Sequence, residues 1–123
     1  MDGDKVANVV TLYMAAWNES DAATRHALLE QCWADGGVYV DPNAELTGRD
    51  VLSQHIAKVQ ASRPGARLEF MSGCDIHHNV LRFEWRLVRV DGTCGDTSVD
   101  FGEIGSDGRL VKMIGFFGAA PNL

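Results

Sequence analysis

The sequence predicts an α+β domain in which three helices close one side of a curved antiparallel sheet and enclose one apolar pocket. Up to residue 65, apolar residues recur with helical spacing in three segments. Beyond residue 65, apolar and polar residues alternate between turn signals, as in a β-meander. The 123 residues, 46% of them hydrophobic, suffice for one core, so we expect residues 1–123 to form one domain with one site.

The first helix is predicted from about Asp4 to Trp17. Apolar residues there repeat with the helical period and form one stripe, which consists of Val6, Val9, Val10, Tyr13, Met14 and Trp17. A tyrosine in such a stripe is either a core residue with its hydroxyl satisfied at the edge or part of a pocket that the helix covers. Tyr13 is therefore a candidate site residue.

Two more helices are expected before residue 65. Residues 18–21 are of types that cap helices, and the apolar spacing then resumes through Trp33, which predicts a second, shorter helix. Thr47 to Ala61 predicts a third helix, which ends before Arg63-Pro64-Gly65. His55, on its apolar side, is either a structural histidine or a proton shuttle.

Six strands are predicted. The first is Val38-Tyr39-Val40 and ends at Asp41, because Pro42 stops the ladder. The others are expected near residues 67–72, 75–77, 80–90, 97–104 and 110–117. Asp91-Gly92 and Asp107-Gly108 are the strongest hairpin signals between them.

The predicted 80–90 strand has two chemically different faces. An apolar set alternates with a charged set, and these are Leu81, Phe83, Trp85 and Leu87 against Arg82, Glu84 and Arg86. We expect the apolar set to face the helices. The charged set is then expected to face solvent or a second copy of the chain.

Charge and cysteine content exclude several classes of function. The net charge is −6 and the basic residues are scattered, so no nucleic-acid or membrane partner is expected. The first residues are acidic where a secretory signal would be basic, and no run approaches the roughly 18 to 20 apolar residues of a spanning helix, which favours a cytoplasmic location. Cys32, Cys74 and Cys94 lack paired spacing, so we expect no disulfide, no metal site and no cofactor.

The order of elements and four motifs resemble the SnoaL-like branch of the nuclear-transport-factor-2-like superfamily over nearly the whole chain. The motifs are Tyr13 to Asn18, Tyr39-Val40-Asp41-Pro42, Val99-Asp100-Phe101 and Asp107 to Leu110. The resemblance implies a cone-shaped half-barrel whose mouth is closed by helices, and a homodimer formed through the outer sheet face. The superfamily contains isomerases, dehydratases, cyclases, epoxide hydrolases and binding modules, so the fold leaves the chemistry open.

Similarity to ketosteroid isomerase, a relative with this fold, implies an acid/base site. That enzyme uses an aspartate base with a tyrosine and a protonated aspartate as hydrogen-bond donors to the oxyanion. The matching motifs place the base on Asp41 and the two donors on Tyr13 and Asp100, with a small apolar carbonyl compound as substrate. The supporting tyrosine of that enzyme corresponds to Ile56 here, so the network around Tyr13 differs.

Each acidic candidate also has a structural explanation. Asp41 before Pro42 is a standard turn opener, whose carboxylate bonds nearby amides. Asp100 lies at a strand centre, where a carboxylate either faces solvent or is buried with partners and a raised pKa. The expected walls of the pocket are the apolar and aromatic side chains Trp17, Trp33, His55, Phe83, Trp85, Met113 and Phe117.

Two other functions remain open at this stage. The same residues fit a non-catalytic small-molecule binding module or a dimerising accessory domain. An epoxide hydrolase or dehydratase would need either His55 within reach of Asp100 or the charged set of the 80–90 strand on the inner face. His77 and His78, adjacent in sequence, are expected to point to opposite faces and so not to share a metal ion.

Overall fold

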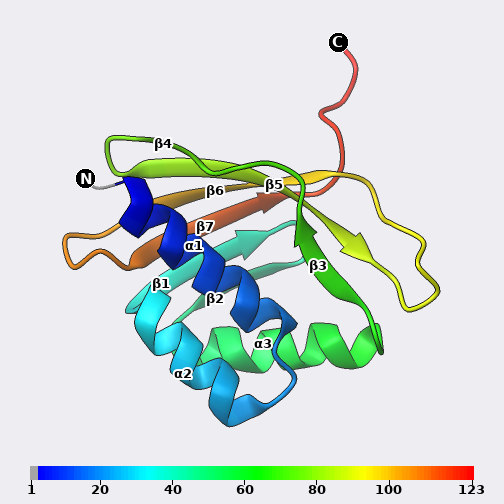
Figure 1. Ribbon diagram of the computed structural model, residues 1–123, viewed down its shortest axis with the longest axis horizontal. Coiled ribbons are helices and arrows are strands. Elements are labelled where there is room, and N and C mark those ends of the chain that lie inside the picture. Colours follow the sequence, from blue (N-terminus) through cyan, green and yellow to red (C-terminus); the bar gives the residue numbers. More distant parts are fainter. Residues whose placement is uncertain (1–2) are drawn as a thin grey trace.

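Three helices pack against one face of a curved sheet in the computed structural model, which describes residues 3–123 (Figure 1). The helices are α1 (Gly3–Asn18), α2 (Ala22–Cys32) and α3 (Arg49–Ser62). The strands are β1 (Trp33–Asp41), β2 (Ala44–Thr47), β3 (Arg67–Phe70), β4 (Asp75–His77), β5 (Val80–Val88), β6 (Ser98–Ile104) and β7 (Leu110–Phe116). The predicted α+β class, with a curved open sheet closed by helices on one side, is confirmed.

The sheet is mixed, which corrects the expectation of an antiparallel sheet. Its order is β2-β1-β7-β6-β5-β3, and β4 pairs with the first part of β5. All pairs are antiparallel except β1 with β7, which run parallel. No hairpin turn connects β1 to β7, so local turn signals carry no information about their relative direction.

Element boundaries differ from the sequence prediction mainly around β1. Trp33 begins this strand instead of ending α2, and β1 extends to Asp41. A two-residue turn then leads into β2, which the sequence did not predict, with Asp41 paired to Ala44. Asp91-Gly92 turns within a longer connection of residues 89–97, so it does not join β5 directly to β6.

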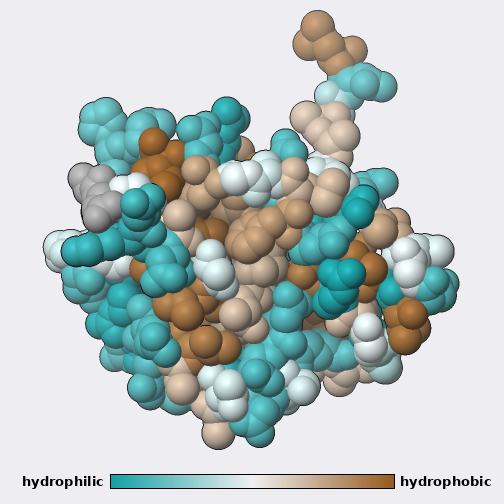
Figure 2. All heavy atoms as spheres, viewed as in Figure 1, coloured by the Kyte–Doolittle hydropathy of each residue, from teal (hydrophilic) through white to brown (hydrophobic). Residues whose placement is uncertain are grey.

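The core lies between the helices and the inner face of the sheet. The buried stripe of α1 consists of Val6, Val10, Tyr13, Met14 and Ala16, as the periodicity predicted. From the sheet, Leu81 and Phe83 of β5 are buried, whereas Arg82 and Glu84 are exposed. The apolar set of this strand therefore faces the helices. Figure 2 shows the face seen in Figure 1 as a mixture of hydrophilic and hydrophobic residues, with hydrophobic groups across the middle and also at the right and the upper left.

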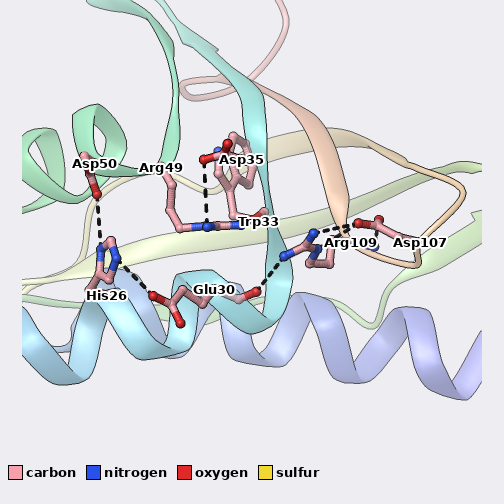
Figure 3. Close-up of polar contacts among 8 residues, drawn as sticks. All are labelled: His26, Glu30, Trp33, Asp35, Arg49, Asp50, Asp107 and Arg109. Atoms are coloured by element: carbon pink, nitrogen blue, oxygen red, sulfur yellow. Dashed lines mark hydrogen bonds and ion pairs between the residues drawn. The ribbon is translucent and has the colours of Figure 1, made fainter.

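Polar contacts fix the junction between α2 and β1 (Figure 3). Arg49 donates two hydrogen bonds to the carbonyl oxygen of Trp33, at 3.1 and 2.7 Å. Arg109 donates another to the carbonyl oxygen of Glu30, at 3.1 Å, and His26 lies 3.2 Å from the Glu30 carboxylate. These contacts satisfy carbonyl groups at the end of α2 and hold the backbone of Trp33 in place. None of the helices in residues 3–123 is long and apolar enough to cross a membrane.

Candidate functional site

A cavity of about 90 Å³ lies between the inner face of the sheet and helices α1 and α3. Aromatic rings supply much of its wall, from Tyr13, Trp17, Tyr39, His55, Trp85 and Phe117. Two carboxyl groups, those of Asp41 and Asp100, also line it. The cavity thus combines an apolar wall with a few polar groups, which is the usual composition of a small-molecule site.

Seven of the ten residues that the sequence singled out line this cavity. They are Tyr13, Trp17, Asp41, His55, Trp85, Asp100 and Phe117. The other three, Trp33, Phe83 and Met113, do not line it and are fully packed in the core. Trp33 stacks against Tyr13 with ring centroids 5.6 Å apart, so it supports a wall residue from behind.

The packing of these three core residues explains why they do not line the cavity as predicted. A Cβ at Gly37 would lie 2.5 Å from the indole nitrogen of Trp33, so the indole fills the space that this glycine leaves open. Phe83 packs edge to face against Phe70 at 5.4 Å. Met113 lies against Gly102 of β6, whose added Cβ would come within 3.1 Å of the methionine sulfur. Sequence periodicity gives the inward direction of a side chain but not its depth.

Asp100 is buried at the centre of β6, with 7% of its surface exposed. The indole nitrogen of Trp85 donates a hydrogen bond to its Oδ1 at 2.9 Å. Burial raises the pKa of Asp100 to about 7, with a further rise from the nearby Asp41 and an opposing effect of the Trp85 hydrogen bond. Near neutral pH a large fraction of Asp100 is therefore protonated, and Oδ2 is available to carry the proton.

Asp41 lies at the end of β1, where two hydrogen bonds orient its carboxylate. The hydroxyl of Tyr39 donates to Oδ2 at 2.6 Å, and the backbone N–H of Asn43 donates to Oδ1 at 2.7 Å. Tyr39 and Asp41 share one face of β1 because they are two residues apart. The Asn43 bond is the turn contact expected of an aspartate before a proline, so the residue opens the turn and lines the cavity at once.

Gly115 of β7 separates the two carboxyl groups. Its strand lies between β1 and β6, and it pairs directly with Asp100. A Cβ added to Gly115 would lie 3.0 Å from Oδ1 of Asp100 and 3.6 Å from Cβ of Asp41. The two acidic side chains thus converge above a residue that leaves room for both.

Tyr13 presents a buried hydroxyl to the same cavity. Only 2% of the residue is exposed, and its hydroxyl has no hydrogen-bond partner among the described residues. The indole nitrogen of Trp17 likewise has no hydrogen-bond partner among the described residues, and the centroids of the Trp17 and Tyr13 rings are 6.4 Å apart. Burial raises the pKa of Tyr13 well above its usual range, and the carboxyl of Asp100 adds to the rise, whereas the nearby indole N–H of Trp17 opposes it. A buried donor without a partner is costly in a folded protein, so a bound ligand would relieve that cost.

The histidines do not form the arrangements that the other hypotheses need. The ring of His55 packs against Trp17 at 6.0 Å and Tyr39 at 5.8 Å, and no hydrogen bond joins it to Asp100 in the described part of the chain. His77 and His78 do not point apart as expected, because His78 has a φ of 51° and brings its Nδ1 within 3.1 Å of the His77 Nδ1. Within residues 3–123, no group of three or more His, Cys, Asp or Glu side chains could hold a metal ion.

The charged set of β5 lies on the outer face. Arg82 pairs with Asp75 at 3.0 Å, and Arg86 pairs with Glu69 at 2.6 Å. An epoxide hydrolase built from this set is therefore not supported, since the cavity is on the opposite face.

Sequence reasoning missed three polar residues of the cavity, Tyr39, Asn43 and Arg63. Tyr39 could have been found, because the two-residue period of a strand places it beside Asp41. Arg63 follows α3, and it reaches the cavity only because the folded chain brings the end of this helix to the same hollow as residues of β3 and β5. Its local sequence contains just a stop signal for the helix.

Solved structures share this fold, whereas no family model and no curated protein matches the chain. A proposed isomerase of the SnoaL-like family from Agrobacterium tumefaciens is 31% identical, with a TM-score of 0.88, over 94% of this chain and 99% of that one. A SnoaL-like protein of unknown function from Burkholderia thailandensis has a TM-score of 0.72 at 15% identity, over 96% and 98% of the two chains. An NTF2-like protein of unknown function from Exiguobacterium has the same TM-score at 16% identity, over 91% and 99%.

These likenesses define the class first and then the family. The curved open sheet with three helices over its inner face is an NTF2-like cone fold, shared by all three structures. The identity and coverage of the Agrobacterium protein go further, and the chain belongs to the SnoaL-like family.

Proposed function

We propose that this protein is an acid/base enzyme that isomerises a small carbonyl compound by moving a proton between two carbon atoms. The observation that carries the proposal is the buried Asp100, whose pKa is raised to about 7 by burial, in the same cavity as the unpartnered hydroxyl of Tyr13. A neutral carboxyl group and a phenol are two donors suited to a developing oxyanion.

The roles follow from the hydrogen bonds that each group already makes. Asp41 takes a proton from the carbon beside the carbonyl, while Tyr39 and the Asn43 amide hold its carboxylate in place. The carbonyl oxygen becomes an enolate oxygen, to which Tyr13 and the neutral Asp100 donate. Asp41 then returns a proton to a different carbon, either the one it took or one that has exchanged with solvent, so the product is an isomer of the substrate and no other reactant is consumed.

The test is proton exchange beside a carbonyl group. Small ketones are incubated with the protein in D₂O, and loss of the proton signal is followed by NMR. Asp41→Asn should lower the rate by about 10²- to 10⁴-fold, with folding unchanged by circular dichroism. Asp35→Asn, an exposed aspartate on β1, is the matched control. Retained exchange in Asp41→Asn would contradict the role of this residue as the base.

The pH dependence tests Asp100 separately. Because its pKa is about 7, the proton that it donates is lost above that pH. The kcat/KM for exchange should therefore fall above about pH 7 in the wild type, and this limb should disappear in Asp100→Asn, whose amide still donates. An unchanged limb in that variant would assign the titration to another group.

A non-catalytic binding module is the second candidate, because the buried donors of Tyr13 and Trp17 can hold a polar group of a ligand without any reaction. The cavity of about 90 Å³ is below the roughly 300 Å³ at which typical ligand pockets begin, so a small ligand fits it best. A binding module would retain a small apolar ligand and release it unchanged. Mass spectrometry of the recovered ligand separates the two functions, because isomerisation changes its chromatographic retention or its deuterium content.

We further propose that two copies associate through the outer face of the sheet. Phe101 and Phe116 are 40% and 56% exposed there, and their rings contact each other edge to face at 6.0 Å. Next to them on the same face lie Ile114, Glu103 and Lys112, which together with Phe101 line a hollow of about 500 Å³. Exposed aromatic rings within a polar rim are typical of interfaces. Sedimentation of the wild type and of Phe116→Glu should show a dimer and a monomer respectively.

A further inference from the structure

A second hollow that contains positive charge lies beside the cavity. This outer hollow, of about 290 Å³, is lined by Arg63, Pro64, Ala66, Leu87, Arg89 and Val90. Arg63 lines both spaces, which places them next to each other. The segments after α3 and after β5 form this part of the molecule, on the right in Figure 1.

Its two arginines are unusual among the arginines of this chain. Six of the eight arginine side chains make a hydrogen bond or an ion pair, and these are Arg25, Arg49, Arg67, Arg82, Arg86 and Arg109. Within the described residues, the guanidinium groups of Arg63 and Arg89 make neither. In a chain with a net charge of −6, the two arginines whose side chains have no such partner among the described residues line the same hollow beside the cavity.

The acidic groups nearby leave this charge largely uncompensated. Among the described residues, no carboxylate lines the outer hollow, and the two of the inner cavity are engaged with Tyr39 and Trp85. Asp91, two residues after Arg89, bonds mainly to Thr93, and Arg89 contributes only in part to the lowered pKa of that aspartate. Free guanidinium groups are strong binders of carboxylate and phosphate groups.

We infer that the ligand of this site is an anionic carbonyl compound, whose carboxylate or phosphate binds Arg63 and Arg89 in the outer hollow. Its apolar, carbonyl-bearing end lies in the inner cavity, against Tyr13 and Asp100. The inference rests on the proposed function for the placement of the carbonyl group. The anion site itself rests only on the two arginines and on the adjacency of the two hollows.

Binding of matched charged and neutral probes tests the anion site. The probes are 4-oxopentanoate, 6-oxoheptanoate and 8-oxononanoate, each paired with its methyl ester, together with 4-oxopentyl phosphate. Dissociation constants come from calorimetry and from the fluorescence of Trp17 and Trp85, both of which line the cavity. At least one acid should bind roughly threefold to tenfold more tightly than its ester at low salt, and the preference should shrink in 0.5 M NaCl.

Variants assign the preference to named residues. Arg63→Gln should reduce the preference of acid over ester, and Arg63→Gln with Arg89→Gln should abolish it. Arg82→Gln removes the same charge on the outer face of the sheet and should leave the preference unchanged. The phosphate probe distinguishes the two sources of negative charge, because a phosphate ligand would bind more tightly than the acid of equal length.

The outcomes separate this inference from the proposed function. Equal affinity for acids and esters, no measurable binding of any probe, or a preference that survives the double variant overturns the anion site. An arginine-dependent preference without deuterium exchange supports the anion site and counts against the enzyme. Exchange of neutral ketones at a kcat/KM that Arg63→Gln does not alter, with acids turned over no faster, supports the enzyme and overturns the anion site.

Discussion

Asp100 and Glu69 lie on opposite faces of one sheet, and their carboxyl groups behave in opposite ways. Burial at the cavity raises the pKa of Asp100 to about 7, although Trp85 donates a hydrogen bond to it. On the outer face, hydrogen bonds from Arg86 and Arg67 lower the pKa of Glu69. The inner face buries Asp100 without a cation, and the outer face pairs Glu69 with two. The surroundings of a carboxyl group therefore decide whether it can donate a proton near neutral pH.

The largest difference between the two faces should appear in packing. Phe83→Ala on the inner face should lower the free energy of unfolding by about 3–5 kcal/mol, because the side chain is buried with 1% exposure and leaves a cavity. Phe116→Ala removes the same side chain from the outer face and should cost about 1 kcal/mol or less in the monomer. Urea denaturation at low protein concentration measures both values. Similar losses would show that the outer face is covered.

The next difference concerns the pH dependence of stability. The pKa of Asp100 rises from 3.8 to about 7 on folding, so between these pH values the folded protein binds a proton that the unfolded chain has lost. Stability therefore falls as pH rises from about 4 to 7 and stays lower above it. The full effect is on the order of 4 kcal/mol.

Asp100→Asn removes that penalty. The variant should be more stable than the wild type at pH 8, with the difference vanishing near pH 4, while Trp85 keeps an oxygen acceptor. Thermal and urea unfolding at several pH values measure this difference. A variant less stable than the wild type at pH 8 would show that Asp100 is ionised with a compensating partner.

A smaller change probes the convergence of the two acids. Gly115→Ala places a methyl group 3.0 Å from Oδ1 of Asp100 and should destabilise the fold by about 1–3 kcal/mol. It should also weaken ligand binding, because the added methyl group fills the space between the two carboxyl groups. Gly36→Ala on β1 is the control, since its Cβ would meet nothing within 4 Å. Unaltered binding in Gly115→Ala would place the ligand away from the two acids.

The smallest effect is expected at Glu69. Its lowered pKa means that the carboxylate stabilises the folded state above the ordinary pKa of a glutamate, and that this contribution is lost as pH falls through the folded value. Glu69→Gln should therefore be slightly less stable than the wild type at pH 7, and the two should converge in acid. This change in stability has the opposite sign to that expected for Asp100→Asn. Changes of the same sign in the two variants would contradict the proposed difference between the faces.

Local patterns were sufficient for most elements of this fold. The stripe on α1, the alternation on β5 and the stop at Arg63-Pro64-Gly65 each follow from a period or a turn that neighbouring residues define. Strand β2 and the start of β1 at Trp33 were missed, because both depend on pairing partners. Parallel pairing of β1 with β7 was missed for the same reason, since the two strands are 70 residues or more apart in sequence.

The sequence by itself determined the fold class, the two faces of β5 and the placement of Tyr13 on the buried face of α1, because each depends on a local period; it left open whether Asp100 faces inward. Tertiary structure decided the burial depth and the neighbours of each side chain. It placed Trp33, Phe83 and Met113 in the core. It also brought Asp41 and Asp100 together at Gly115, and Arg63 together with Arg89 in one hollow. The burial depth of a charged group sets its desolvation, and its neighbours set its hydrogen-bond and ion-pair partners. Only the folded chain therefore decides whether an acid is protonated near neutral pH and whether an arginine is left without a partner.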